Sequence, residues 1–380
     1  MMRRWFFTSC LLAAATGCAS PRTARPAEPA VTTEPAAAVA AAPTKPGRSP
    51  GQDAYDEGYA LAMAGDFSAA LPLFRKATEL DPQLAVGWFD LAGLSEQLGF
   101  EEEALVAMQR AVDAEPRFVQ ARIELASLTL GVRDDAAAAL AHLRRALTET
   151  APFVIDRYSA ARSRGEALHK VAATYGAIGF IGATESIAHG AFSDPGAEPD
   201  RRAARVADTA QADIDVELVP TPELAAAIAE LKRDAAAATT RPAAEAALRR
   251  HRALTSKVEG RHAVDRWMVW RQLAHLEIVA EQLEAAVTSL ATAAEVAKRL
   301  PLVHWLDTTY ARIAIEIKLG RLDAAMRGFD ELAWLEYAAA YADGPAGEQR
   351  RSREALTDAA FAPLRSRAEF AAIVTEFRLR

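Results

Sequence analysis

The chain has 380 residues, of which 51% are hydrophobic and 7% aromatic, and its formal net charge is −7. This length allows two or more cores at roughly 100–200 residues per domain. The acidic balance disfavours a nucleic-acid partner, because phosphates attract clusters of lysine and arginine. Alanine dominates the hydrophobic fraction, and since it is the strongest helix former, the composition predicts closely packed helices.

The first predicted element is an export signal. Arg3 and Arg4 precede an apolar run that ends near Ala15 and is shorter than the roughly 20 residues that span a bilayer. The run closes in Ala15-Thr16-Gly17-Cys18, which resembles the lipobox of bacterial lipoproteins. The resemblance implies that residues 1–17 are removed and that Cys18 is acylated with fatty acid. Ala19 after the cysteine implies the periplasmic face of the outer membrane, while the export route, general or twin-arginine, stays open.

The second element is a tether. Residues 18–50 are rich in proline and alanine, so they cannot build a core, and we expect them to be disordered and to reach on the order of 100 Å when extended. The chain has two cysteines, Cys10 and Cys18. The body after Cys18 therefore offers no disulfide, thiol nucleophile or cysteine-bound metal.

A repeat of 34 residues begins after the tether and fills residues 51–150 with three units. Small and large residues recur at this spacing, as in Ala70 and Ala104, Phe74 and Met108, and Pro82 and Pro116. This pattern resembles the tetratricopeptide repeat, and the resemblance implies an all-α solenoid of antiparallel helix pairs. Small residues would lie where the helices of a pair cross, and the prolines would end each second helix.

The remaining chain carries weaker repeat signals. Residues 151–262 are predicted to be irregular and helical, with a degenerate fourth unit at 168–192 and helices starting near Pro222 and Pro242. Gly176, Gly179 and Gly182 lack the spacing of a phosphate-binding loop and are interpreted as sites of close helix contact. Residues 263–335 predict two further units, and 336–380 resemble the closing segment of bacterial tetratricopeptide arrays, which caps the last apolar face.

The sequence predicts no enzyme. It contains no His-Glu-x-x-His and no Gly-x-Ser-x-Gly, so no catalytic or metal-binding residues, cofactor or small-molecule substrate are expected. His251 and His262 are interpreted as solvated surface histidines, since Gly260 separates them from a common helix. The Glu101-Glu102-Glu103 run is expected at a helix N-terminus, where acidic side chains offset the helix dipole.

The tetratricopeptide resemblance implies a binding groove lined by the first helix of each unit. Carried over residue by residue, the groove positions include Tyr55, Tyr59, Phe89, Glu96, Gln120 and Ile123. Aromatic and aliphatic side chains there would form a floor for a docked segment. Tyrosines replace the lysine and asparagine clamp of chaperone-binding members, so a peptide C-terminal carboxylate is not the expected ligand.

Three functions follow from these features. The first is a lipid-anchored scaffold of the cell envelope that binds other envelope proteins in its groove, as an analogy at fold level suggests. The second is an envelope hydrolase with its site in residues 151–262, where the repeat is weakest. The third is a structural spacer without a dedicated ligand.

Overall fold

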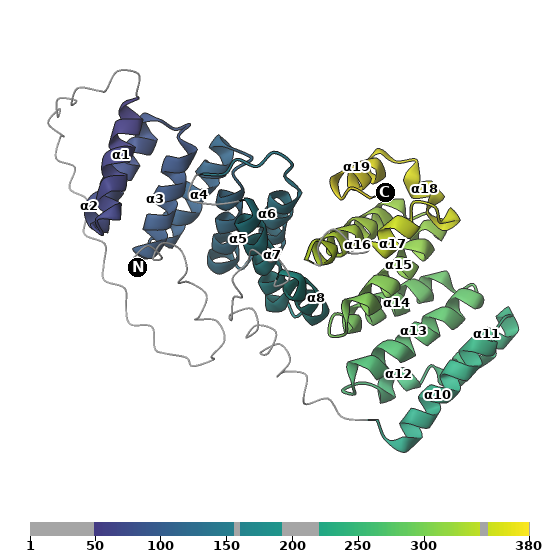
Figure 1. Cartoon of the computed structure of the whole chain (residues 1–380). Coiled ribbons are helices and arrows are strands. Elements are labelled where there is room, and N and C mark those ends of the chain that lie inside the picture. Colours follow the sequence, from purple (N-terminus) through teal and green to yellow (C-terminus); the bar gives the residue numbers. More distant parts are fainter. Residues whose placement is uncertain (1–48, 156–159, 192–219, 343–348, 380) are drawn as a thin grey trace. The chain divides into compact units, whose positions relative to one another are not determined.

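The computed structural model describes residues 49–155, 160–191, 220–342 and 349–379 (Figure 1). The signal peptide, Cys18 and all but the last two residues of the tether lie outside these residues. The chain divides into two compact units, residues 1–115 and 116–380. Within the described ranges both units are helical, the one β contact there being an isolated bridge between Phe118 and Phe153.

The first unit consists of two helix pairs, α1 with α2 and α3 with α4. Their bounds are α1 Pro50–Met63, α2 Phe67–Leu80, α3 Ala85–Gln97 and α4 Glu101–Ala114. Gly65 and Gly99 turn the chain between the helices of each pair with φ of 88° and 84°, a region that glycine enters without steric cost. The helices end two residues before Pro82 and Pro116, and the glutamate run fills the first turn of α4. The 34-residue repeat therefore forms helix pairs as predicted.

Small side chains allow the two helices of each pair to pack closely. Ala70 and Ala104 are fully buried, and a Cβ on Gly58 would lie 3.1 Å from the Cβ of Leu73. Phe74 and Met108 fill the adjacent space and are buried to within 2%. Each pair buries one apolar face within itself and needs a neighbour for the other.

The second unit begins with two more pairs. They are α5 Val119–Arg133 with α6 Ala136–Thr148, and α7 Ala160–Ala177 with α8 Ile181–Ala191. These correspond to the third repeat and to the degenerate fourth repeat expected from the sequence, and both are helix pairs.

The rest of the second unit is also helical. Its long helices are α10 Pro222–Ala237, α11 Arg241–His251, α13 Ala263–Val279, α14 Leu283–Ala297, α15 Leu302–Lys318 and α16 Leu322–Ala342, with the short α12 Leu254–Lys257 between α11 and α13. The pairs α13–α14 and α15–α16 lie where the sequence predicts two further repeats. The boundary expected at residue 335 falls inside α16, which runs on to Ala342.

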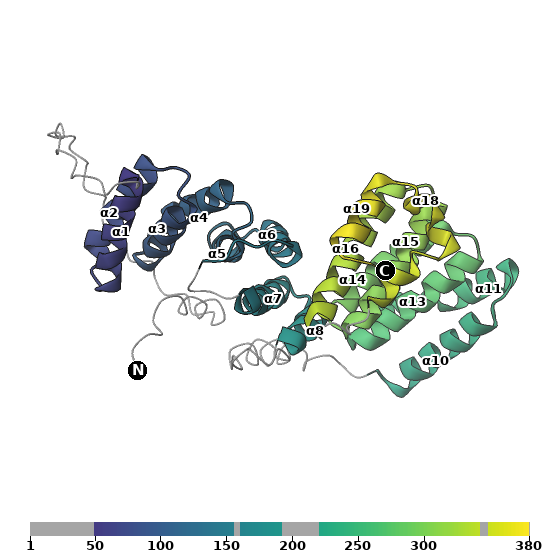
Figure 2. The same ribbon diagram turned by 45° about the horizontal axis from the view of Figure 1, so that its top comes forward.

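The helices of the second unit do not stack in sequence order. α8 packs against α16 and α15, whereas α10 and α11 pack against α13, at the other end of the C-terminal pairs (Figures 1 and 2). The C-terminal pairs therefore join α5–α8 through their last helix. Side chains from α5–α8 and α14–α16 share one apolar core, so these helices pack together in the second unit.

Backbone contact at Gly182 fixes this junction. The N–H of Gly182 donates a hydrogen bond of 2.9 Å to the carbonyl oxygen of Lys298, and a Cβ at Gly182 would lie 1.9 Å from the carbonyl oxygen of Leu300. The close contact expected at this glycine is real, but its partner is the connection between α14 and α15. Gly179 instead occupies the α7–α8 turn with φ of 76°.

The C-terminal segment covers α15 and α16. It contains α17 Arg350–Glu354, a 3₁₀ turn Ala359–Phe361, α18 Ala362–Arg365 and α19 Ala368–Glu376. Phe370 stacks on Phe329 of α16 at 4.6 Å between ring centroids, and Phe361 stacks on Tyr310 of α15 at 4.7 Å. This segment thus shields apolar side chains of the last pair from water.

Candidate protein-binding faces

The tyrosines of α1 form a small aromatic surface in the first unit. Tyr55 and Tyr59 lie one turn apart and their rings stack with centroids 5.9 Å apart. The hydroxyl of Tyr55 donates a hydrogen bond of 2.7 Å to the carboxylate of Asp90 on α3, and its ring lies 5.7 Å from that of Phe74. Tyr59 keeps 36% of its surface exposed. The structure therefore holds one predicted groove tyrosine in place and presents the other to solvent.

The other predicted groove residues are placed differently. Phe89 is fully buried, and Glu96 on the same helix is half-buried. In the second unit Ile123 is 1% exposed, and Gln120 is buried and donates a hydrogen bond of 2.6 Å to Ser163 on α7. These three buried side chains, Phe89, Gln120 and Ile123, pack inside the protein in this structure, so they support a surface rather than form its open floor.

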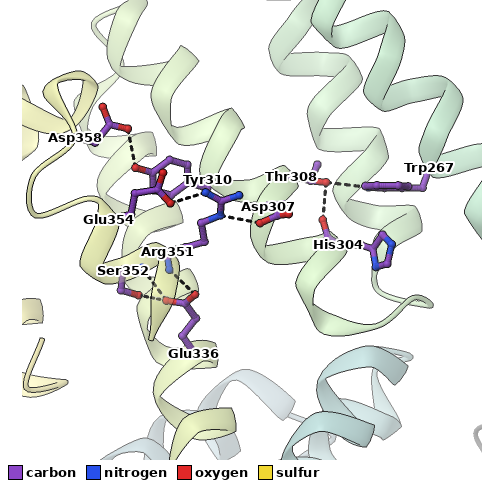
Figure 3. Close-up of polar contacts among 10 residues, drawn as sticks. All are labelled: Trp267, His304, Asp307, Thr308, Tyr310, Glu336, Arg351, Ser352, Glu354 and Asp358. Atoms are coloured by element: carbon purple, nitrogen blue, oxygen red, sulfur yellow. Dashed lines mark hydrogen bonds and ion pairs between the residues drawn. The ribbon is translucent and has the colours of Figure 1, made fainter. Parts of the chain in front are cut away.

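A polar cluster joins α15 to α17 in the second unit (Figure 3). Arg351 of α17 donates a hydrogen bond of 2.7 Å to Asp307 and pairs with Glu354, while its guanidinium lies 5.2 Å from the ring centroid of Tyr310. The hydroxyl of Tyr310 donates to Asp358 at 2.7 Å. By the register of the repeat, Asp307 and Tyr310 occupy groove positions of α15. This part of the groove is therefore filled by the chain's own C-terminal segment.

Glu336 of α16 binds the first residues of α17 (Figure 3). It is 4% exposed, and its carboxylate accepts hydrogen bonds from the backbone N–H groups of Arg351 and Ser352 and from the Ser352 hydroxyl, all at 2.6–2.8 Å. Burial raises the pKa of Glu336 above its ordinary value. Sequence reasoning missed this cluster, since nothing in the local pattern joins α16 to a segment beyond residue 348.

Arg271 lies on α13 beside this cluster. The pKa of its guanidinium is lowered first by burial, with Asp307 acting in the opposite sense and Arg351 in the same sense. Its Nε is buried and has no hydrogen-bond partner among the described residues. Trp267, one turn before Arg271 on α13, donates its indole N–H to Thr308 at 2.9 Å and meets the ring of His304 edge-on at 4.5 Å (Figure 3).

His251 corrects one expectation from the sequence. Instead of being solvated it is 3% exposed, and its Nε2 lies 2.7 Å from a carboxylate oxygen of Asp234 on α10. It ends α11, while His262 caps α13, so the two histidines occupy different helices as expected. The hydrogen bond with His251 is the largest cause of the lowered pKa of Asp234.

Glu230, Asp234 and His251 could offer three ligand atoms within 4.8 Å of one another. However, the guanidinium of Arg250 pairs with Asp234 and lies 4.0 Å from Glu230. A cation of the chain itself therefore already lies against both carboxylates. We assign this group neither a metal nor a catalytic role, although it lies within the segment 151–262 considered for a hydrolase.

Comparisons with known proteins find likenesses of fold. No family model matches the chain, and no curated protein matches it. Among solved structures, a type IV pilus biogenesis factor, PilW, is 14% identical over 81% of this chain and 98% of its own, with a TM-score of 0.30. A tetratricopeptide repeat protein from Parabacteroides merdae is 12% identical over 77% and 97%, with a TM-score of 0.34. The tetratricopeptide domain of P58(IPK) is 14% identical over 86% and 82%, with a TM-score of 0.30.

These scores stay below 0.5, so the class of the protein rests on its own helices. The pairs α1–α2 and α3–α4 repeat after 34 residues, with glycine in each turn and alanine at each crossing, and helix pairs continue in the second unit. Together they define an all-α fold of the tetratricopeptide type. No helix in the described ranges is long and apolar enough to cross a bilayer.

Proposed function

We propose that this protein is a lipid-anchored scaffold of a bacterial cell envelope, which binds segments of other envelope proteins on the first helices of its repeats. The observation that carries the binding role is the stacked pair of Tyr55 and Tyr59, fixed through Asp90 and exposed at Tyr59. Rigid aromatic side chains at a surface are typical anchors of protein interfaces, because they bury much area and lose little entropy.

A binding test compares Tyr59→Ala with Leu80→Ala. Both side chains are exposed apolar groups of the first unit, at 36% and 50%, so the two variants remove similar surface without opening the core. The full chain, carrying a photo-crosslinking residue at Met63, is irradiated in cells and its crosslinked products are counted. Loss of specific products in Tyr59→Ala alone supports the binding face.

Equal crosslinking in wild type, Tyr59→Ala and Leu80→Ala would leave the spacer without a dedicated ligand as the better account. Phe89→Ala is unsuitable for this comparison. Phe89 is fully buried, and removing a buried phenylalanine costs about 3–5 kcal/mol of stability whatever the protein binds.

The anchor is proposed from the sequence alone. A basic start, a short apolar run and Cys18 in a lipobox-like setting support lipid attachment, and the absence of cysteine after Cys18 leaves that residue no disulfide partner in the body. Outer-membrane attachment follows from Ala19 by the same resemblance. A tether of proline-rich sequence would then let the repeats reach partners away from the membrane surface.

Cys18→Ser and Cys10→Ser form a matched pair for the anchor. Cells are fed an alkyne-labelled palmitate, and the label on the protein and its share in the membrane fraction are measured. We expect Cys18→Ser to lose the label and to leave the membrane fraction, and Cys10→Ser to keep both. Label retained on Cys18→Ser would refute lipid attachment at this residue.

A further inference from the structure

Arg271 is a cation of α13 whose charge lies close to those of Asp307 on α15 and Arg351 on α17. Among the described residues no hydrogen bond or ion pair of its guanidinium is formed, and its Nε is buried. Asp307, whose charge acts on Arg271, already accepts a hydrogen bond from Arg351. A buried donor without an acceptor costs about 1–3 kcal/mol, so the unpaired Nε of Arg271 works against folding while no acceptor binds it.

The surroundings of Arg271 suit an extended or helical segment lying along α13. Trp267, Arg271 and His275 follow one another at spacings of four residues and therefore share one face of the helix. His275 is exposed, and Trp267 is half-buried with its ring edge-on to that of His304 (Figure 3). Arg271 is the middle member, so a segment that passes over all three brings an internal residue to the guanidinium.

We infer that Arg271 binds a carboxylate: an Asp or Glu side chain within a protein segment that docks along α13. The inference rests on the proposed scaffold function and names the chemistry of its ligand at this face. A guanidinium offers paired N–H donors that match a carboxylate, and such charge-assisted bonds are about twice as strong as neutral ones. The net negative charge of the body does not oppose this contact strongly, since charges beyond about 8 Å are screened at physiological salt.

The partner's carboxylate is assigned to a side chain rather than to a chain end. A C-terminus would have to stop over the middle of α13 and leave half of this face uncovered. Peptides with a free or an amidated C-terminus separate the two sources, because only a side-chain carboxylate survives amidation.

The experiment uses the full mature chain and three variants. Arg271→Met keeps the length of the side chain without its charge, Arg271→Lys keeps a charge, and Arg266→Met removes a charge from another face of the same helix. Short random peptides displayed on phage are selected on wild type, and the enriched peptides are synthesised with Glu and with Gln at each acidic position. Affinities are measured by fluorescence polarisation.

We expect the enriched peptides to contain an Asp or Glu and to bind Arg271→Met about ten- to hundred-fold more weakly than wild type. The Gln peptides should lose the same factor on wild type and nothing further on Arg271→Met, and C-terminal amidation should leave affinity unchanged. Arg266→Met should bind as wild type does. Arg271→Lys should fall between the two.

A stability measurement separates a binding role of Arg271 from a structural one. If Arg271 serves binding and costs stability, Arg271→Met should unfold at a denaturation midpoint equal to or higher than that of wild type. A lower midpoint, or acidic peptides that bind Arg271→Met as tightly as wild type, would overturn the inference. Enriched peptides without acidic residues would overturn it while supporting the scaffold, and a selection that enriches no peptide at all would count against both.

Discussion

The indole N–H of Trp334 donates a hydrogen bond of 2.9 Å to the hydroxyl of Tyr175, although 159 positions of sequence separate the two residues. This buried bond links α16 to α7, and so ties the last helix of the C-terminal pairs to the pairs that precede residue 191. Burial raises the pKa of Tyr175 above its ordinary value, so the phenol stays protonated and continues to accept this bond across the physiological range.

Tyr175→Phe should therefore destabilise the second unit. The variant keeps the ring but leaves the indole N–H of Trp334 without its acceptor, at a cost of about 1–3 kcal/mol. The urea midpoint of unfolding, at unchanged slope, measures this loss. Tyr59→Phe removes the hydroxyl of a surface tyrosine and should change the free energy of unfolding by less than about 0.5 kcal/mol. Equal stability of the two variants would contradict the role given to this bond.

Gly182→Ala should weaken the junction between α8 and the α14–α15 connection. The new Cβ would lie 1.9 Å from the carbonyl oxygen of Leu300, a backbone atom that cannot move alone, so we expect a loss of about 1–3 kcal/mol or more. Gly165→Ala is the matched control on α7, since a Cβ there meets nothing within 4 Å. It should stabilise the helix by about 0.4–1 kcal/mol. Thermal unfolding of both variants checks the opposite signs.

Arg144 is the charged link between α6 and the C-terminal segment. It pairs with Asp330 of α16 at 2.7 Å and with Glu376 of α19 at 2.7 Å, and its guanidinium lies 4.7 Å from the ring centroid of Phe377. Arg144→Ala should cost about 1.5–3 kcal/mol, the range for hydrogen bonds to charged groups. Arg241→Ala, which removes an exposed pair with Glu245, should cost less stability than Arg144→Ala, because solvent screens an exposed ion pair. Chemical unfolding that ranks the two in the reverse order would refute this assignment.

The hydrogen bond between Tyr310 and Asp358 should affect how the free energy of unfolding changes at acidic pH. The hydrogen bond from Tyr310 is the largest cause of the lowered pKa of Asp358, and the backbone N–H of Ala360 adds to it. A carboxylate whose pKa is lower in the folded state stabilises the fold above its unfolded pKa, near 4, and loses that contribution as the pH falls through the folded value. Tyr310→Phe should therefore be less stable than wild type at neutral pH, and the difference should narrow below about pH 4. Unfolding midpoints measured across pH test this, and a difference that stays constant with pH would exclude Asp358 as its source.

Much of the fold could be predicted because its information is local. The 34-residue recurrence of Ala70 and Ala104 places small residues at helix crossings, and a helix and its neighbour in sequence settle their pairing between themselves. The turn at Gly99 and the helix end before Pro116 follow from single residues. Such features need no knowledge of distant segments.

The order of stacking could not be predicted for the opposite reason. The contact of α8 with α16 depends on how well two apolar faces far apart in sequence fit together. The sequence of neither helix identifies the other as its neighbour. The same limit hid Glu336 beneath Arg351 and Ser352. His251 was misjudged because the residue that holds it, Asp234, lies on another helix, and nothing in the local sequence marks that contact.

The stacking of α8 on α16 has a consequence for how the chain is made. Apolar residues of α8, such as Ala183 and Ile187, reach their full packing only when α16 is present. Residues 192–342 must therefore be synthesised before the core around α8 can close. At about 5–20 residues per second this interval lasts roughly 8–30 s, far longer than a helix pair needs to form. During that time the growing chain carries α8 without its native neighbour, so the apolar face of α8 is open to non-native contacts.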